Sequence, residues 1–381
     1  MLNNYKNLTN TEYERIALQD RVNFSDGHAR QNLSIRQREI VNKSLDFIDL
    51  ANTKSQQEIE ADFLTSFFNC GSQNVRKSQF NPFLAYSSSC SIKIAAQFCR
   101  IRKLKVLLIE PCFDNIRLIL QSEDVPIISI REKQLSDFEY LDKILDHNTA
   151  IWIVQPNNPT GFCLDEATFK LLIDKVSKQK ATLIIDMTFR FFAKSLSNWD
   201  QYGYLTKSET SFISIEDTGK TWSLADNKVG ITVCSKDNFS LIHKFHDELL
   251  LNVSPLQLLL LNEFIKDTIL NGIHDTVYRD IEINRIFIKK LISKGLVESA
   301  SNWTINVPME LLALPPEIPA TKFWGVLREK GVDILPALNY YWTDPLEGTN
   351  LFRIPLSRPI EDFEYAIPMI ESALLDVIEN K

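Results

Sequence analysis

Several polar side chains that could do chemistry stand directly after short apolar runs of this 381-residue sequence. Residues 157–161, Asn-Asn-Pro-Thr-Gly, follow one run, Asp186 ends the next, and Lys220 comes a short turn after a third. Lys228 and Gly230 follow Lys220 by eight and ten residues. Because ligands bind at the carboxyl ends of the strands in parallel sheets, these groups are predicted to converge on one site.

The lysine, the acid and the amide match the needs of pyridoxal 5'-phosphate (PLP). An amine must bind the cofactor aldehyde covalently, and a carboxylate opposite the pyridine nitrogen must keep that nitrogen protonated so that the ring accepts electrons. Lys220 and Asp186 suit these two roles, and Asn158 can donate a hydrogen bond near the phenolic oxygen. Thr188, two residues after Asp186, is predicted to contact the same cofactor.

A phosphate group needs hydroxyls and backbone amides at the N-terminus of a helix, together with a cation. A serine-rich run at 87–91 precedes a helical segment, so Ser88 and Ser89 are candidate phosphate ligands and Lys228 is the candidate cation. Phe113 follows another apolar run and could stack on the cofactor ring. The sequence therefore predicts a complete PLP site.

Each of these residues also has a purely structural interpretation. An aspartate at a strand end often caps a helix, an Asn-Pro-Thr-Gly stretch is usually a turn, and a single lysine is usually a solvated charge. A serine run commonly caps a helix, and a phenylalanine after proline commonly belongs to the core. Since several such residues occur in the order and spacing that the cofactor requires, their combination favours PLP binding.

The apolar runs also predict the elements that must position these groups. Short continuous apolar runs alternate with helix-like stretches, which is the pattern of a mainly parallel sheet covered by helices on both faces. The fold class is therefore predicted to be α/β, with strands at 105–109, 125–130, 150–154, 181–185, 212–215 and 229–234.

Three parts of the chain are expected to differ in role. Residues 1–35 are polar and form an N-terminal arm, in which Thr9 to Glu12 resembles a helix N-cap. Residues 36–280 form the large domain with the sheet and the cofactor. The mixed pattern of residues 281–381 indicates a smaller C-terminal α/β domain.

Composition argues against several classes of protein. A net charge of -7 without a dense Lys/Arg block argues against nucleic acid as a partner. The first residues lack the apolar core of a signal peptide, and no apolar run approaches the ~20 residues that span a bilayer, so a cytoplasmic protein without membrane association is expected. The six cysteines form no C-x-x-C pair and lie in or near apolar segments, so we expect buried, inert thiols and no metal site.

These motifs resemble those of fold-type I PLP enzymes of the class I and II aminotransferase kind. The resemblance covers nearly the whole chain and includes Asn-Pro-x-Gly at 158–161, Asp186, Lys220, Lys228 and Arg353. It implies a large PLP-binding domain, a small C-terminal domain and a homodimer. It also implies that Arg353 pairs with the substrate α-carboxylate, for which a planar guanidinium is suited; a surface arginine at a strand end is the alternative.

Two positions depart from the common family pattern. Phe189 stands where many relatives have a tyrosine against the phenolic oxygen of PLP, and Asp217 replaces the usual serine or threonine three residues before the lysine. A carboxylate so close to the lysine would suit a substrate with a cationic side chain.

A narrower family matches at longer stretches. Residues 26–31, 86–89, 110–115, 216–222 and 253–256 are similar to the oxygen- and PLP-dependent L-arginine oxidases, hydroxylases and desaturases of natural-product pathways. This resemblance implies that the N-terminal arm folds over the bound substrate as a lid.

The same resemblance implies roles for residues of the arm. Thr11, Glu14 and Asp217 would surround the substrate guanidinium, Asp26 would also bind the substrate, and His28 would face the reacting carbons and dioxygen. A buried guanidinium needs paired carboxylates, and a histidine exchanges protons near neutral pH. As isolated residues, Glu14 would instead be a solvated helix charge and His28 a turn cap.

Three functions are compatible with the sequence. The resemblance implies oxidation of L-arginine by dioxygen, begun by removal of the α-proton by Lys220, to a desaturated or 4-hydroxylated 2-imino or 2-oxo product with release of hydrogen peroxide. A conventional aminotransferase acting on a basic amino acid fits the cofactor residues equally. A non-catalytic regulator with this fold fits worst, because the lysine is retained and the length leaves no room for a DNA-binding domain.

Overall fold

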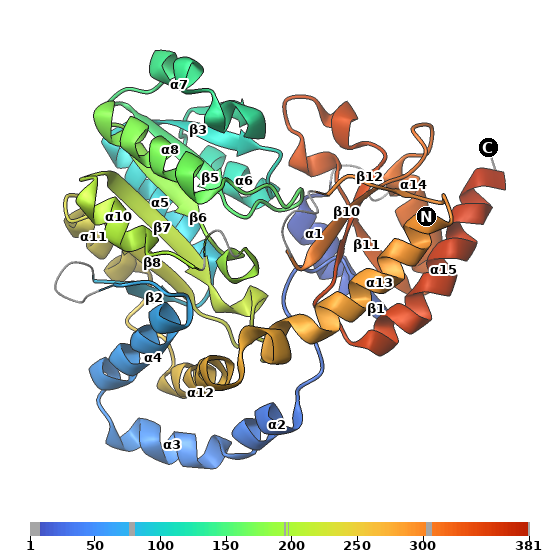
Figure 1. Ribbon diagram of the computed structural model, residues 1–381, viewed down its shortest axis with the longest axis horizontal. Helices are drawn as coiled ribbons and strands as arrows, with labels where there is room; N and C mark the ends of the chain where they lie inside the picture. Colours follow the sequence, from blue (N-terminus) through green and yellow to red (C-terminus); the bar gives the residue numbers. More distant parts are fainter. Residues whose placement is uncertain (1–7, 76–80, 194–195, 197, 302–306, 380–381) are drawn as a thin grey trace.

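Two lobes, each built on one β-sheet, make up the protein (Figure 1). The computed structural model describes residues 8–75, 81–193, 196, 198–301 and 307–379. In this part of the chain, no helix is long and apolar enough to cross a membrane.

The large lobe is built around a sheet of seven strands. Neighbouring strands across it are β2 (Phe83–Ala85), β8 (Gly230–Cys234), β7 (Ser211–Asp217), β6 (Thr182–Asp186), β5 (Thr149–Val154), β3 (Lys105–Glu110) and β4 (Ile127–Arg131). The strands from β7 to β4 are parallel, and β8 is antiparallel to both of its neighbours. Every predicted apolar run forms a strand of this sheet, because such runs are buried on both faces. The prediction of a mainly parallel α/β fold is confirmed.

Helices cover both faces of the large sheet (Figure 1). One face carries α8 (Glu166–Lys178) and α10 (Gln201–Lys207), and the other carries α5 (Ser88–Arg102), α6 (Asp114–Ser122) and α11 (Phe239–Leu249). The short α7 (Phe138–Ile144) contacts α8. A further helical layer joins the N-terminal and middle parts of the chain, with α12 (Pro255–Asn271) contacting α2 (Ile35–Asn42), α3 (Ser44–Thr53) and α4 (Gln56–Cys70).

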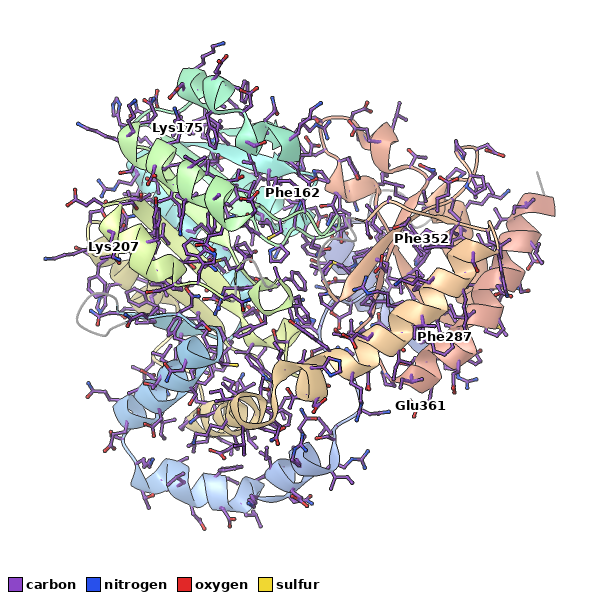
Figure 2. The ribbon with its side chains drawn as sticks, in the orientation of Figure 1. Phe162, Lys175, Lys207, Phe287, Phe352 and Glu361 are labelled. Carbon is purple, nitrogen blue, oxygen red and sulfur yellow. The ribbon has the colours of Figure 1, made fainter. Side chains whose placement is uncertain are left out.

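The small lobe is built on a sheet of five strands. Their order is β1 (Val22–Phe24), β11 (Val332–Pro336), β12 (Leu351–Pro355), β10 (Met309–Ala313) and β9 (Glu298–Ser299). It is accompanied by α13 (Arg279–Ser293), α14 (Ala320–Glu329) and α15 (Ile360–Glu379). Phe352 of β12, labelled in Figure 2, is fully buried in this lobe with its ring 5.3 Å from that of Phe323.

Part of the N-terminal arm is built into the small lobe. Strand β1 pairs in parallel with β11, and helix α1 (Asn10–Ala17) packs against the same strand. The predicted cap is confirmed, since Thr9 and Glu12 form a capping box at the start of α1. Tyr13 is buried edge-on against Trp324, with ring centroids 4.9 Å apart. The polar composition of the arm did not indicate this pairing, and the division of the chain at residues 35 and 280 stays a prediction.

All six cysteines lie in the described part of the chain and are free. Cys99, Cys112 and Cys234 are buried, and burial raises the pKa of each thiol above its ordinary value. These three agree with the expected inert thiols, whereas the other three are partly exposed.

Candidate active site

A cavity of about 420 Å³ lies at the carboxyl edge of the large sheet and is also lined by residues of the arm and of the small lobe. Its volume is within the range of small-molecule sites. The lining includes Thr11, Glu14, His28, Ser88, Ser89, Phe113, Asn158, Asp186, Thr188, Asp217, Lys220, Lys228 and Arg353. The structure thus brings together all but one of the predicted site residues.

The sheet topology explains this convergence. Phe113 follows β3, Asn158 follows β5, Asp186 ends β6, and Lys220 lies in the short helix η4 (Thr218–Lys220) after β7. Since these strands are parallel, their carboxyl ends share one edge of the sheet. Lys228 reaches the same edge from the other direction, because it immediately precedes the antiparallel strand β8.

Within the described part of the chain, neither Lys220 nor Asp186 has a charged partner in direct contact. Among the described residues, the amine of Lys220 makes no hydrogen bond or ion pair, and it borders the cavity. Asp186 is 7% exposed, and its Oδ1 accepts hydrogen bonds from Thr188 N at 2.9 Å and from the Thr188 hydroxyl. Burial nevertheless raises the pKa of Asp186 to about 6. A cation against this carboxylate, such as a protonated pyridine nitrogen, would stabilise its charged form.

The start of α5 and Lys228 line one end of the cavity, where a phosphate is predicted to bind. Ser88 and Ser89 open α5, where backbone N–H groups are not used within the helix. Gly230 allows β8 to come close, since a Cβ there would lie 2.4 Å from the carbonyl oxygen of Ser87 and 2.8 Å from Ser88 N. Helix N-terminus, hydroxyls and ammonium together fit the phosphate of PLP.

Asp217 borders this end of the cavity and is buried. Its Oδ2 accepts a hydrogen bond from Ser88 N at 2.9 Å, and its Oδ1 accepts one from Gly219 N at 2.7 Å. A carboxylate has about four acceptor positions, so each oxygen keeps one for a ligand. Asp217 therefore holds η4 against α5 and still presents negative charge to the cavity.

Asn158 lies where both lobes meet over the cavity. Its Oδ1 accepts hydrogen bonds from the Tyr340 hydroxyl at 3.3 Å and from Arg353 Nη1 at 3.4 Å. The Tyr340 ring is also edge-on to Phe113, with centroids 6.0 Å apart. Phe189 lines the cavity without a hydroxyl, so the phenol beside Asn158 comes from the small lobe instead.

Arg353 on β12 is 1% exposed, and its guanidinium donors are unequally satisfied. Its Nη2 donates to the carbonyl oxygen of Ser25 and lies 3.4 Å from Glu14 Oε1. Its Nε is buried without a hydrogen-bond partner among the described residues, and its Nη1 makes only the long contact to Asn158. A buried charged donor without a partner is costly, so this guanidinium is suited to a further acceptor such as a carboxylate.

Glu14 lies beside this arginine with its side chain 18% exposed. Burial raises the pKa of Glu14, and the charges of Arg353 and Lys220 oppose that rise. Its carboxylate lines the cavity from the arm, as does the side chain of Thr11.

His28 connects the arm to Lys228. Its Nδ1 lies 2.5 Å from Asp26 Oδ1, and its Nε2 lies 2.8 Å from Lys228 Nζ. Burial lowers the pKa of His28, and the charges of Lys220 and Lys228 act in the same direction. These partners fit a neutral imidazole that donates from Nδ1 to Asp26 and accepts at Nε2.

Asp26, predicted as a substrate contact, lies behind His28 and is not among the described residues that line the cavity. It is 4% exposed, and its second oxygen accepts a hydrogen bond from Arg30 Nε at 2.9 Å. Burial alone would raise the pKa of Asp26, but the hydrogen bond from His28 and nearby positive charges hold it well below its usual value. Both oxygens are engaged, Oδ1 by the imidazole of His28 and Oδ2 by the guanidinium of Arg30, so the position of Asp26 suits orientation of His28.

Three lining or neighbouring residues were not predicted individually. Tyr86 and Asn115 line the cavity, and Asn115 Nδ2 donates to Ser89 Oγ at 3.1 Å. Both belong to stretches that carried the narrower resemblance, which could have identified them. Tyr340 had no such indication, because only the docking of the two lobes brings it to Asn158.

Comparison with known proteins identifies the family. The family described as aminotransferase class I and II matches residues 28–370. The chain belongs to this family. The match covers both lobes, and it confirms the predicted family and fold-type I architecture, for which PLP is the expected cofactor.

Curated relatives match over shorter stretches. A histidinol-phosphate aminotransferase of Macrococcus caseolyticus (strain JCSC5402) is 25% identical over 186 residues, which are 49% of this chain and 51% of the relative. A cystine lyase of Arabidopsis thaliana is 31% identical over 114 residues, or 29% of this chain and 27% of the lyase. The chain spans about half the length or less of these relatives, so this likeness alone does not carry their activities over.

Solved structures match over nearly the whole chain. A structure of MppP soaked with the product 2-ketoarginine has a TM-score of 0.84 and 29% identity, covering 92% of this chain and 98% of MppP. The histidinol-phosphate aminotransferase from Clostridium acetobutylicum has a TM-score of 0.74 at 16% identity, covering 93% and 99%, which shows a shared fold. The likeness to MppP agrees with the narrower resemblance in the sequence.

Proposed function

We propose that this protein uses PLP and dioxygen to oxidise L-arginine, giving a desaturated or 4-hydroxylated 2-imino or 2-oxo product and hydrogen peroxide in natural-product biosynthesis. The observation that carries the proposal is a single cavity lined by Arg353, which has an unsatisfied Nε among the described residues, and by two carboxylates, Glu14 and Asp217. These two carboxylates are additional to Asp186, which is assigned to the cofactor. The likeness to MppP, whose structure was soaked with 2-ketoarginine, supports the same class of substrate.

The residues present fit PLP. Among the described residues, the amine of Lys220 has no hydrogen-bond partner, and the cofactor aldehyde would react with it. Burial raises the pKa of Asp186, and a protonated ring nitrogen would stabilise its charged form. When bound, PLP draws electrons from the α-carbon of the substrate. Lys220 would hold the cofactor aldehyde and supply the amine that takes the α-proton of the substrate, and Asp186 would keep the ring nitrogen protonated. Lys228 and the start of α5 would hold the phosphate.

The substrate residues divide between two charges of arginine. The donors of Arg353 that have no close partner among the described residues receive the α-carboxylate. Glu14, Asp217 and Thr11 surround the guanidinium. A buried cation left without one of its partners costs about 3–5 kcal/mol, so paired carboxylates favour arginine over neutral side chains of the same shape.

The oxidation balances with dioxygen as the oxidant. Formation of the plain 2-oxo acid removes two electrons from arginine, and these reduce one dioxygen to hydrogen peroxide while water enters and ammonia leaves. A desaturated or 4-hydroxylated product is oxidised by two further electrons, so it requires a second dioxygen, which is reduced to a second hydrogen peroxide. Water supplies the oxygen of the 4-hydroxyl group. His28 lines the cavity, and its Nε2, which accepts from Lys228 Nζ at 2.8 Å, is the nitrogen that would exchange a proton with water there. The position of that water decides whether the product is hydroxylated or desaturated.

We also propose a homodimer, which is the usual assembly of this fold, with residues 1–35 as the lid of the site. In this proposal residues 36–280 are the PLP-binding domain and residues 281–381 the small domain. Strand β1 and the lining residues of the arm support the lid, because they bring it over Lys220.

Oxygen uptake by the purified, PLP-loaded protein with L-arginine tests the proposal, with and without 2-oxoglutarate. Uptake that needs no 2-oxo acid and forms peroxide is expected, and Lys220→Ala should abolish it. No uptake but formation of glutamate would instead establish a conventional aminotransferase acting on a basic amino acid. The histidinol-phosphate aminotransferases among the relatives favour this second candidate.

A further inference from the structure

Arg358 lies between β12 and α15 and is only 1% exposed. Its guanidinium donates to four backbone carbonyl groups, and three of them belong to the N-terminal arm. The acceptors are Asn23 O at 2.7 Å, His28 O at 2.6 Å, Ser357 O at 2.9 Å and Asp26 O. One side chain of the small lobe thus binds the arm on both sides of residue 26.

The arm has no regular structure of its own from residue 25 to residue 34. Its backbone is also tied to the rest of the protein by Ala29 N to Gly219 O at 2.8 Å and by Arg30 N to Ser357 O at 3.0 Å, and by bonds that Ser25 O accepts from Arg353 and Gln31 O accepts from Ser223. A buried carbonyl group without a donor is costly, so the conformation of residues 23–28 depends on the guanidinium.

This segment carries His28 into the cavity. The imidazole Nε2 reaches Lys228 Nζ at 2.8 Å while the carbonyl of the same residue is bound by Arg358. Gly27 passes directly over the site, because a Cβ on it would lie 3.7 Å from Lys220 Nζ. Arg358 itself is not among the described residues that line the cavity.

The choice of arginine here is informative. No carboxylate among the described residues lies within ion-pair distance of Arg358. Its buried guanidinium instead forms hydrogen bonds to neutral carbonyl groups. A guanidinium offers five donors in a fixed plane, whereas a lysine offers three from one point. A rigid fork is therefore suited to hold an irregular segment in one position.

We infer that Arg358 is a positioning residue that holds residues 23–28 so that His28 is presented to the cavity, without contact to the substrate. The expected effect of Arg358 on kcat rests on the proposed function, whereas its expected effect on the conformation of the arm does not.

Amide hydrogen exchange of the full-length, PLP-loaded protein tests the conformational part. In Arg358→Gln and Arg358→Lys, residues 22–30 should exchange about tenfold faster or more, while strands β5 and β6 keep their rates. Arg285→Lys is the matched control, because Arg285 is a buried arginine of the same lobe that pairs with Glu310, and it should leave the arm unchanged. If Arg358→Gln does not fold, Arg358→Lys alone decides, since it keeps the charge. Unchanged exchange of the arm would overturn the inference.

A double-mutant cycle with His28→Ala tests the catalytic part. Arg358→Lys should lower kcat for arginine oxidation about tenfold in the wild type but less than about twofold in His28→Ala, because both changes act through the imidazole. His28→Ala should leave exchange of the arm unchanged, since the carbonyl of residue 28 remains. Losses that multiply fully would overturn the inference. If the wild type consumes no oxygen with arginine, the proposed function fails, and the exchange experiment alone decides the role of Arg358.

Discussion

Replacing Asp186 with asparagine should stabilise the PLP-free protein and weaken its binding of PLP. Asp186 Oδ1 accepts both hydrogen bonds from Thr188, and the oxygen of an asparagine side chain can accept the same two. The substitution therefore removes the charge and keeps the local contacts.

The magnitude follows from the pKa of the buried acid. Burial raises the pKa of Asp186 from 3.8 to about 6. An acid whose pKa rises on folding binds its proton more tightly in the folded state, so the free energy of unfolding falls as pH rises from about 4 to about 6. Two pKa units correspond to about 3 kcal/mol, which is the largest loss expected for the PLP-free protein. The asparagine variant does not titrate and lacks this loss.

Urea unfolding of the PLP-free wild type and Asp186→Asn at pH 4.5 and pH 8 measures the effect. Because the wild type has already lost about 1 kcal/mol of the roughly 3 kcal/mol at pH 4.5, the difference in unfolding free energy should move in favour of the variant by about 2 kcal/mol between the two pH values. Asp49→Asn, an exposed aspartate on α3, should give no such change. With PLP bound, the order should reverse because a protonated ring nitrogen then faces the carboxylate. A change below about 1 kcal/mol would refute the idea that Asp186 lacks a compensating cation in the PLP-free protein.

Three further substitutions test other parts of the site. Glu14→Gln should lower the preference for L-arginine over its neutral isostere citrulline by about 30-fold or more, because one partner of a buried cation is lost. The ratio of the kcat/KM values for the two substrates measures this preference. Equal losses for both substrates would contradict a contact between Glu14 and the guanidinium. Gly230→Ala should weaken PLP binding by about 1–3 kcal/mol in an absorbance titration, because its Cβ would meet the backbone before α5 at 2.4 Å; unchanged affinity would show that this close approach is not needed. Tyr340→Phe should lower kcat/KM about 2- to 10-fold by removing the hydrogen bond to Asn158. Tyr365→Phe, which loses a bond to the backbone of Lys330, should leave kcat/KM unchanged, and equal effects of the two would point to general destabilisation.

The large sheet could be predicted because its strands are short, apolar and buried on both faces. Each such run is recognisable from local sequence alone, and the parallel arrangement follows from the helical stretches between the runs. The same arrangement made the site predictable, since polar residues such as Asp186 and Lys220 stand where strands end. Local sequence thus contained both the sheet and the edge that carries the cofactor residues.

What could not be predicted depends on contacts between distant parts of the chain. Strand β1 has three residues and pairs with β11, more than 300 positions later, so its pairing has no local pattern. Asp217 and Asp26 were recognised as acids, but their neighbours were not: backbone amides engage the first, and His28 and Arg30 engage the second. Which oxygens remain for a substrate is decided by those neighbours.

The pairing of β1 with β11 attaches the proposed lid, residues 1–35, to the small lobe. Arg353 lies on β12 in the same sheet, and its Nη2 binds the carbonyl of Ser25 in the arm. Arg358, just beyond the end of β12, holds the next part of the arm. Arg353, Glu14 and His28 are therefore attached to one sheet, whereas Lys220 belongs to the other. A shift of the small lobe against the large lobe would move the arm and Arg353 together over the lysine, so closing the site and placing the substrate carboxylate would be a single motion.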